Sequence, residues 1–231
     1  MSVFFIGGID TDIGKSYATG MMARYLLKRK ISVITQKLVQ TGVGSTIADD
    51  LLLHRKLMGI VPQPRDIDGT TCPQLFKFPA SPHLAAAREN RTIDLELITE
   101  ATAVLQREYE IVLLEGAGGM HVPLKHDCLT IDYVAEQRYP LILVTSGRLG
   151  SINHTLMSLE TAVARGIPIA GLVFNHCCDS NSEIAADALK IFCNELKKYG
   201  CDNALVELPR VDENNPVEIT FANIFNKGFS C

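Results

Sequence analysis

Residues 2–16 read SVFFIGGIDTDIGKS, and this stretch decides the fold of the chain. Its first five residues predict a buried strand, and the amphipathic pattern over residues 15–29 predicts a helix directly after the loop. A strand, a glycine-bearing loop ending in Lys15-Ser16 and a helix are typical, in this order, of a phosphate-binding P-loop. The backbone N–H groups of such a loop and of the helix N-terminus carry partial positive charge, which phosphates complement. We therefore expect this loop to bind a nucleotide.

The positions of the loop have distinct expected roles. Lys15 reaches the outer phosphates, and the hydroxyl of Ser16 is a ligand for Mg²⁺. The loop is a variant, because the usual pattern places its first glycine five positions before the second. That position is Ile9 here, and Gly8 lies one residue further out. The nucleotide contacts predicted within the loop are Gly8, Asp12, Ile13, Gly14, Lys15 and Ser16.

Short apolar runs alternate with amphipathic stretches along the rest of the chain. Continuous apolar strands separated by helices predict a mainly parallel sheet covered by helices on both faces. Right-handed crossovers bring the carboxyl ends of the strands to one edge, where ligands bind. We expect residues 1–231 to form one α/β domain with a P-loop NTPase-like fold, in which the proline-rich residues 59–80 make a long surface loop. The expected strands cover residues 32–36, 111–114, 141–144, 169–174 and 204–207, and the expected helices cover residues 48–58, 95–107, 152–164 and 183–198.

The composition excludes several functional classes. The formal net charge is −4, and the longest basic run, residues 28–30, falls where a helix should end, so nucleic acid is not an expected partner. No apolar stretch approaches the roughly 18 residues of a membrane span, and the N-terminus does not resemble a signal peptide. Seven cysteines without regular spacing indicate a reduced, cytoplasmic protein. His176-Cys177-Cys178 is not a predicted metal site, because adjacent cysteines rarely chelate one ion.

Charged side chains follow two of the expected strands. Glu115 ends the strand 111–114 and precedes a glycine-rich turn, where Gly118 lets a phosphate or substrate approach the backbone. P-loop enzymes place a carboxylate near Mg²⁺ in this way. Lys37 follows the strand 32–36 and projects at the same edge as Lys15, although a solvated surface lysine would show the same spacing. Two lysines and Mg²⁺ suit a transition state that gathers charge on several oxygens.

The segment after Lys37 offers weaker candidates. Thr41 lies in the same loop. Asp49 opens the next expected helix, where it would either join the Mg²⁺ ligands or complement the helix dipole, and the adjacent Asp50 competes for both roles. From the residues alone we predict an enzyme that uses Mg-ATP to activate an anionic or carbon dioxide-derived group, and the acceptor stays open.

From end to end, the chain resembles the dethiobiotin synthetase family. The order and spacing of several blocks carry this resemblance together. It implies an ATP-dependent ligase of biotin biosynthesis, in which CO₂ adds to an amine of 7,8-diaminononanoate. The carbamate then takes the γ-phosphoryl group of ATP, and the second amine closes the ureido ring of dethiobiotin and expels phosphate. The blocks are GIDTDIGKS at 8–16, KLVQTG at 37–42, SPH at 81–83, LEGAGG at 114–119, LGSINH at 149–154 and FN at 174–175.

The same resemblance implies a role for each matching residue, with a homodimer whose substrate site lies near the interface. The implied groups are Lys15 and Lys37 for the carbamate and the transferring phosphoryl group; Ser16, Asp49 and Glu115 for Mg²⁺; Thr11, Asp12 and Thr41 for the junction of γ-phosphate and substrate; Asn175, Pro209 and Glu213 for the nucleotide base; and Leu149, Gly150 and Asn153 for the substrate carboxylate across the interface.

Four departures from the family pattern affect fit more than reaction type. Leu38 replaces a common proline, Asp12 replaces the usual glutamate, and Arg148 replaces a common lysine. Met120-His121 stands where the family has an aromatic-rich pair. None of these changes removes a charged group that the reaction needs.

Three other functions compete with this interpretation. Nucleotide-switched dimeric ATPases of the partitioning or metal-insertion type carry a second lysine early in the phosphate loop, but residues 7–13 contain none. An amidating ligase of the cobyrinate type needs a glutaminase domain, for which 231 residues leave no room. A binding protein with a decayed P-loop would not be expected to retain Lys15, Ser16, Lys37 and Glu115 together.

Overall fold

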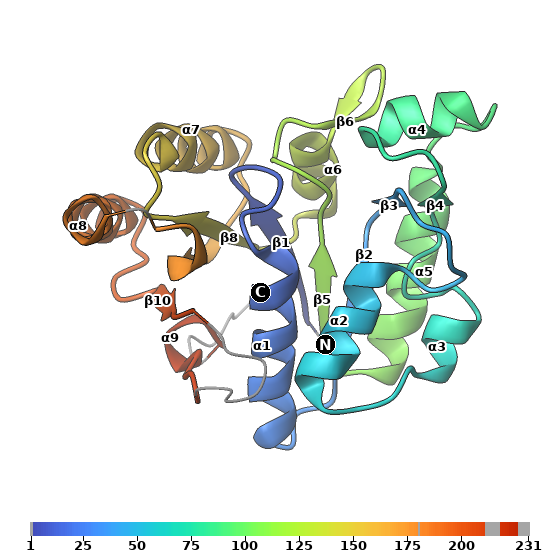
Figure 1. Ribbon diagram of the computed structural model, residues 1–231, viewed down its shortest axis with the longest axis horizontal. Coiled ribbons are helices and arrows are strands. Elements are labelled where there is room, and N and C mark those ends of the chain that lie inside the picture. The colour runs from blue at the N-terminus through green and yellow to red at the C-terminus, as the bar shows by residue number, and fades with distance from the viewer. Residues whose placement is uncertain (1, 180, 211–217, 226–231) are drawn as a thin grey trace.

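The computed structural model describes residues 2–179, 181–210 and 218–225, and Figure 1 shows their arrangement. Six parallel strands form the central sheet in the order β10-β9-β8-β1-β5-β2. Strand β1 pairs with both β8 and β5, so the loop that follows it starts near the middle of the sheet. The strands are Ser2–Gly8 (β1), Val33–Lys37 (β2), Ile111–Glu115 (β5), Leu141–Ser146 (β8), Ile169–Asn175 (β9) and Leu205–Leu208 (β10).

Helices cover both faces of this sheet. In Figure 1, α1 (Lys15–Lys28) and α2 (Asp49–Met58) lie side by side in front of the sheet, and α5 (Leu95–Glu108) and α6 (Thr130–Gln137) lie behind it. No helix in the described ranges is long and apolar enough to cross a membrane. The other helical segments are α3 (Pro64–Ile67), α4 (Pro82–Arg88), α7 (Ser151–Ala164), the 3-10 turn η1 (His176–Cys178), α8 (Ser182–Lys198) and α9 (Ala222–Phe225).

The predicted parallel α/β fold is confirmed, and each predicted strand and helix lies within a few residues of an observed one. The prediction of a plain surface loop over residues 59–80 was wrong in part. This segment contains α3 and the short strand β4 (Leu75–Phe76), which pairs in parallel with β3 (Gln40–Thr41). A second small sheet joins β6 (Pro123–Lys125) to β7 (Cys128–Leu129). These short elements have too few residues for a periodic pattern to reveal them.

The hydrophobic core lies between the sheet and its helices. Phe5, Ile6, Leu113, Leu143 and Phe174 come from four neighbouring strands and have exposed fractions of 0%. Their burial excludes water from the interior, and each such side chain contributes about 1.5–3 kcal/mol relative to an exposed position. The packed strands hold the loops at their carboxyl ends in fixed positions.

A buried ion pair attaches the 59–80 segment to α2. The guanidinium of Arg55, 1% exposed, donates from Nε and Nη2 to the two carboxylate oxygens of Asp66, at 2.8 and 2.7 Å. The hydroxyl of Thr71 and the backbone N–H of Gln63 also donate to Asp66, at 2.7 and 2.6 Å. The carboxylate is therefore fully engaged, as buried charges usually are.

Replacing Asp66 with alanine should lower the free energy of unfolding by about 3–5 kcal/mol, because the Arg55 guanidinium would be left buried without a counter-charge. Urea denaturation of the purified variant measures this effect. The matched control is Glu108→Ala, which removes the exposed partner of Arg65 and should shift the urea midpoint very little. Equal midpoints for the two variants would contradict the structural role of Asp66.

Candidate active site

A cavity of about 580 Å³ lies at the carboxyl edge of the central sheet. Its walls come from the P-loop, the ends of β2 and β5, the first turns of α2, and the segments after β9 and β10. Open parallel sheets bind ligands at this edge. The predicted site residues that line it are Thr11, Asp12, Gly14, Lys15, Ser16, Lys37, Thr41, Glu115, Gly118, Asn175 and Pro209.

The P-loop has the shape that its glycine dictates. Gly14 precedes α1 with a φ of 88°, a left-handed conformation that favours glycine. A Cβ atom at this position would lie 2.1 Å from Nδ2 of Asn175, so a larger side chain has no room. Asp12 adopts a φ of 56° in the same loop. The chain can therefore approach a bound phosphate closely before it enters the helix.

Glu115 is the centre of the charged part of the cavity. Its side chain has an exposed fraction of 0%, and its Oε1 accepts hydrogen bonds from Ser16 Oγ at 2.8 Å and from Lys37 Nζ at 2.7 Å. Burial alone would raise the pKa of Glu115, but the charge of Lys37, together with the hydrogen bonds from His54 and Lys37, holds it well below its usual range. Glu115 is therefore an ionised carboxylate.

Lys37 lies between two carboxylates. Its Nζ is 2.7 Å from Glu115 Oε1 and 2.5 Å from Asp50 Oδ2, and it also donates to the backbone oxygen of Gly116 at 3.0 Å. Burial would lower the pKa of Lys37, but Glu115 and Asp50 outweigh this effect and raise it. This lysine is therefore buried and charged. The alternative left open by the sequence, a solvated surface lysine, does not apply.

The pKa of Lys15 is shifted in the opposite direction to that of Lys37. Its Nζ donates to the backbone oxygen of Asp10 at 2.8 Å, within its own loop. Burial and then the nearby charge of Lys37 lower the pKa of Lys15 to about 8. An anionic ligand would raise this pKa again, because phosphate favours the protonated amine.

Nucleotide affinity should fall as the pH rises through 8, since the free protein then loses the proton of Lys15 that the phosphates require. The loss should approach about tenfold per pH unit above that value. Calorimetric titration of ATP into the protein on either side of pH 8 measures it. In Lys15→Gln this dependence should disappear, and a flat wild-type profile would show that Lys15 does not titrate in this range.

The oxygen donors near Glu115 suit Mg²⁺. Ser16 Oγ, Glu115 Oε1 and the carboxylate of Asp50 all face one region of the cavity. Within the described residues, no group of three or more His, Cys, Asp or Glu side chains could hold a metal by itself. Mg²⁺ is usually held by one or two carboxylates together with substrate phosphates and water, so this donor set fits it.

Asp49 and Asp50 have different positions at the start of α2. Asp50 lines the cavity and pairs with Lys37, whereas Asp49 is exposed and does not line the cavity. Asp49 was the expected Mg²⁺ ligand and Asp50 its competitor, and of these two residues only Asp50 lines the cavity. Adjacent residues point about 100° apart around a helix, so only one of the two aspartates can point into the cavity, and that residue is Asp50.

The other end of the cavity holds Asn175. Its Nδ2 donates to the backbone oxygen of Ile13 at 2.9 Å, and its Oδ1 accepts from the backbone N–H of Cys177 at 3.1 Å. Both ends of the amide are therefore used within the protein, and the end of β9 is tied to the P-loop. Leu208 and Pro209 also line this end, and Glu213 lies outside the described residues.

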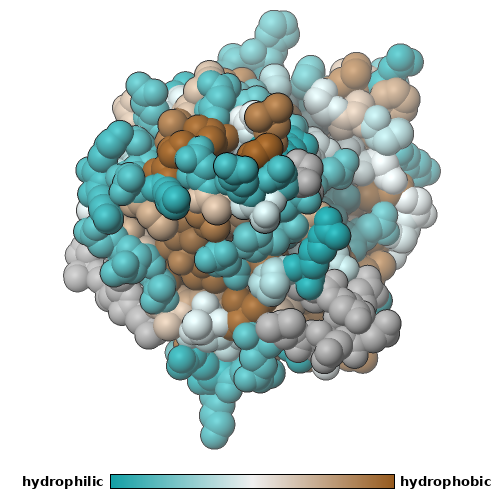
Figure 2. Space-filling view, turned by 60° about the vertical axis from the view of Figure 1, so that its left-hand side comes forward, coloured by the Kyte–Doolittle hydropathy of each residue, from teal (hydrophilic) through white to brown (hydrophobic). Residues whose placement is uncertain are grey.

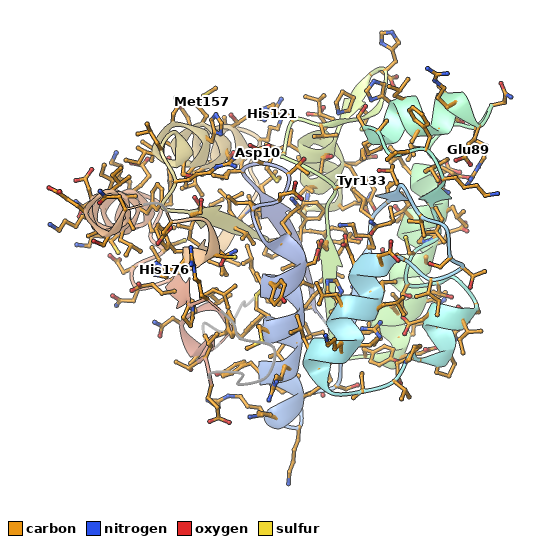
Figure 3. The ribbon with its side chains drawn as sticks, in the orientation of Figure 1. Asp10, Glu89, His121, Tyr133, Met157 and His176 are labelled. Carbon is orange, nitrogen blue, oxygen red and sulfur yellow. The ribbon has the colours of Figure 1, made fainter. Side chains whose placement is uncertain are left out.

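His176 follows Asn175 and links two strand ends. Its ring bonds to Asp179 through Nδ1 at 2.5 Å and to Glu207 through Nε2 at 2.8 Å, and so joins the end of β9 to β10 (Figure 3). Burial lowers the pKa of His176, but Glu207 and Asp179 raise it by more. In the sequence this histidine stood out only as a possible metal ligand beside two cysteines, and its contacts with Asp179 and Glu207 could not be foreseen.

The segment predicted to bind a substrate carboxylate lies outside the cavity. Leu149, Gly150 and Asn153 are exposed at the start of α7, and the side chain of Leu149 is 84% exposed. Figure 2 shows hydrophobic residues gathered among polar ones on the face that carries α7 and α8. Within a single chain, these three residues do not meet the cavity.

An ion pair links this segment to the P-loop. Arg148, just before Leu149, pairs with Asp10, which Figure 3 shows in the loop above β1 on the side of α7. Of the other departures from the family pattern, Leu38 and Met120 are buried and Asp12 lines the cavity. Two of the four therefore change packing, and Arg148 keeps the positive charge of the lysine it replaces.

Comparisons with known proteins identify the family of this chain. The sequence model of a family described as AAA domain matches residues 2–215. The ATP-dependent dethiobiotin synthetase BioD of Chlorobaculum tepidum is 50% identical over 204 residues, covering 88% of this chain and 85% of its own. BioD 2 of Haemophilus influenzae is 54% identical, covering 75% and 90%, and BioD 2 of Pasteurella multocida is 47% identical, covering 89% and 96%.

Solved structures with low sequence identity share the fold. A ParA family ATPase from Chlorobium tepidum superposes with a TM-score of 0.53 at 18% identity, covering 92% of this chain and 86% of its own. The structure of pNOB8 ParA bound to nonspecific DNA gives a TM-score of 0.53 at 12% identity, covering 91% and 86%. At such identities the likeness concerns the P-loop fold alone. With relatives at 47–54% identity over most of its length, this chain belongs to the ATP-dependent dethiobiotin synthetase family.

Proposed function

We propose that this protein is an ATP-dependent dethiobiotin synthase, which closes the ureido ring of dethiobiotin from 7,8-diaminononanoate and CO₂. The observation that supports this function best is the cluster of Lys15, Ser16, Lys37 and Glu115 around one cavity beside the P-loop. Two cations and a carboxylate at this place suit phosphoryl transfer to a carbamate. Membership in the dethiobiotin synthetase family supports the same substrates.

The reaction has three balanced steps. One amine of the substrate forms a bond to CO₂ and loses a proton, which gives a carbamate. A carbamate oxygen attacks the γ-phosphorus of ATP, ADP leaves, and a carbamic-phosphoric anhydride remains. The second amine attacks the carbamoyl carbon, loses a proton and expels phosphate as the ring closes.

The lysines position the reactants and balance their charge. Phosphoryl transfer needs little covalent help from a protein, so alignment and electrostatic stabilisation supply most of the rate. We assign Lys15 to the β- and γ-phosphates and Lys37 to the carbamate and the transferring phosphoryl group. Thr11, Asp12 and Thr41, which line the cavity nearby, border the reacting oxygens. Because Lys37 is buried, its charge acts with little screening by water.

Ser16, Asp50 and Glu115 are the residues that would hold Mg²⁺. When bound, Mg²⁺ neutralises negative charge on the phosphate oxygens of ATP. We assign Asp50 in place of Asp49, because Lys37 pairs with both Asp50 and Glu115 and so brings these two carboxylates together.

Replacing Asp50 with asparagine should raise the Mg²⁺ concentration needed for half-maximal activity by about tenfold or more, because one of the two carboxylates near the metal is lost. Titration of Mg²⁺ at saturating ATP measures the change. Asp49→Asn is the matched control, since it alters the exposed neighbour on the same helix turn. A larger effect at position 49 than at 50 would reverse this assignment.

Asn175 and Pro209 border the nucleotide base in this proposal. Asn175 lines the cavity at the end away from Lys37, and an amide has both a donor and an acceptor for an adenine edge. Nδ2 carries two hydrogens, and its bond to Ile13 uses one, so the second can be donated to an acceptor on adenine. Asn175 can therefore contact adenine and hold the P-loop at the same time.

We further propose that the protein works as a homodimer whose second copy supplies Leu149, Gly150 and Asn153 to the substrate carboxylate. The exposure of these residues outside the cavity of their own chain supports a shared site. Mixing Asn153→Ala with Lys15→Gln should then restore part of the activity that each lacks, because some mixed dimers contain one site with both native residues. Activity no higher than the sum of the separate variants would contradict a shared site.

The decisive experiment measures phosphate release from Mg-ATP with and without 7,8-diaminononanoate and bicarbonate, and identifies the product by mass. We expect release to require both additions and to yield dethiobiotin. Release that ignores the diamine would overturn the proposal and favour a nucleotide-switched ATPase. The low identity to the ParA structures gives that alternative no support beyond the fold.

A further inference from the structure

His54 is a buried histidine that the proposed reaction does not use. It lies on α2, four residues after Asp50 and so on the same helix face, and its side chain has an exposed fraction of 0%. Its Nε2 lies 2.9 Å from Oε2 of Glu115, and its Nδ1 lies 3.0 Å from Oγ1 of Thr35 on β2. Both ring nitrogens therefore have partners inside the protein.

The two oxygens of Glu115 have separate partners as a result. Oε1 faces the cavity, where it accepts from Ser16 and Lys37, and Oε2 faces inward, where it meets His54. A glutamate side chain can rotate about three bonds, so one held oxygen does not fix the carboxylate plane. Contacts to both oxygens, from opposite sides, do fix it.

The hydrogen bonds that link Arg55, Thr35 and His54 can all be donated toward Glu115. Nη1 of Arg55 donates to Oγ1 of Thr35 at 2.7 Å, and the two carboxylate oxygens of Asp66 hold the same guanidinium in place. The Thr35 hydroxyl has one hydrogen, which can be donated to Nδ1 of His54. Nδ1 is then the acceptor, and Nε2 carries the hydrogen that is donated to Glu115. The chain of donors runs from Arg55 through Thr35 and His54 to Glu115.

We propose that His54 is a positioning residue for Glu115, holding Oε2 inward so that Oε1 alone is presented to Mg²⁺ and to Ser16. This inference rests on the proposed metal role of Glu115. Partners of metal-binding carboxylates orient them, and loss of such a partner commonly weakens metal binding by about 10–100-fold. Without His54, the inward oxygen would lack a donor and the carboxylate would be free to turn.

Three variants test this role by metal binding without turnover. His54→Leu keeps most of the volume but removes the donor, and His54→Gln keeps an N–H group at a similar reach. Thr102→Val removes a different buried hydrogen bond, to Gln36 on the α5 side of the sheet, and controls for general loss of stability. Mn²⁺ binding in the presence of a non-hydrolysable ATP analogue is followed by electron paramagnetic resonance.

We expect His54→Leu to weaken Mn²⁺ binding by about 10–100-fold, His54→Gln to recover most of it, and Thr102→Val to leave it unchanged. In the complete reaction, His54→Leu should need more Mg²⁺ while the KM for the diamine stays the same. Wild-type Mn²⁺ affinity in His54→Leu would overturn the inference. Equal weakening in Thr102→Val would overturn it too, because the effect would then reflect stability alone.

A measurement on the wild-type protein removes any dependence on how the variants fold. Nitrogen-15 NMR of the histidine rings reports which nitrogen carries hydrogen, and we expect a protonated Nε2 on His54. An unprotonated Nε2 could not donate to Glu115 and would overturn the inference. Neither this spectrum nor Mn²⁺ binding requires the diamine, so failure of the dethiobiotin assay would leave the result for His54 intact.

Discussion

Replacing Lys37 with methionine should damage both stability and catalysis. The change keeps the length of the side chain but leaves Glu115 and Asp50 without their shared cation in a buried position. We expect the free energy of unfolding to fall by about 3–5 kcal/mol at neutral pH, as when one partner of a buried pair is removed. Turnover should fall at least about a hundredfold, because the role proposed for Lys37 is to stabilise charge at the reacting oxygens. Urea denaturation and phosphate release measure the two effects.

The stability of Lys37→Met should depend on pH in the opposite direction to that of the wild-type protein. In the wild-type protein the pKa of Glu115 lies below its unfolded value, so its pairing stabilises the fold above that unfolded value and is lost as the pH falls. Without Lys37, burial should raise the pKa of Glu115, and the variant should regain stability as the pH is lowered through the raised pKa. Lys77→Met, at an exposed position, is the control. Wild-type stability and turnover in Lys37→Met would contradict the structure of the site.

Replacing Lys15 with glutamine should nearly abolish turnover without destabilising the fold. In the proposed mechanism Lys15 is the P-loop cation for the β- and γ-phosphates, and loss of one such contact in a water-poor site costs about a hundredfold or more. Because the pKa of Lys15 falls to about 8, its charge opposes folding below that pH. The variant should therefore be at least as stable as the wild type at neutral pH. Steady-state kinetics and thermal unfolding measure the two quantities.

The control for this variant is Lys28→Gln, at the other end of the same helix, where the side chain is exposed and pairs with Glu218. It should retain wild-type kinetics. We therefore expect Lys37→Met to lose both stability and activity, and Lys15→Gln to lose activity alone. Near wild-type turnover in Lys15→Gln would exclude the P-loop as the catalytic phosphate site.

The sequence predicted the fold because its strongest patterns are its longest ones. The buried strands and the helices over residues 15–29, 95–107, 152–164 and 183–198 repeat their period often enough to identify each element. Helix α6 escaped prediction because eight residues give only about two turns of pattern. The β3–β4 pair depends on contacts between distant segments, which local patterns do not contain.

The candidate site was predictable where it follows a strand. Lys37 and Glu115 end adjacent parallel strands, so strand order alone brings them together. The choice between Asp49 and Asp50 depends on where α2 begins, and a shift of one residue turns a side chain by about 100°. His54 carried a usable signal, because it lies one helical turn after Asp50. Its contact with Thr35, however, becomes visible only once α2 packs on β2.

The contact between Asn175 and the P-loop has a consequence for how this cavity distinguishes nucleotides. Nδ2 of Asn175 holds the carbonyl of Ile13, and the absent side chain of Gly14 is what makes room for that amide. A base that takes over the hydrogen bond would loosen the loop that cradles its own phosphates. Because one side chain holds the loop and borders the base, a substitution of Asn175 that broadens base choice will also change the affinity for the triphosphate.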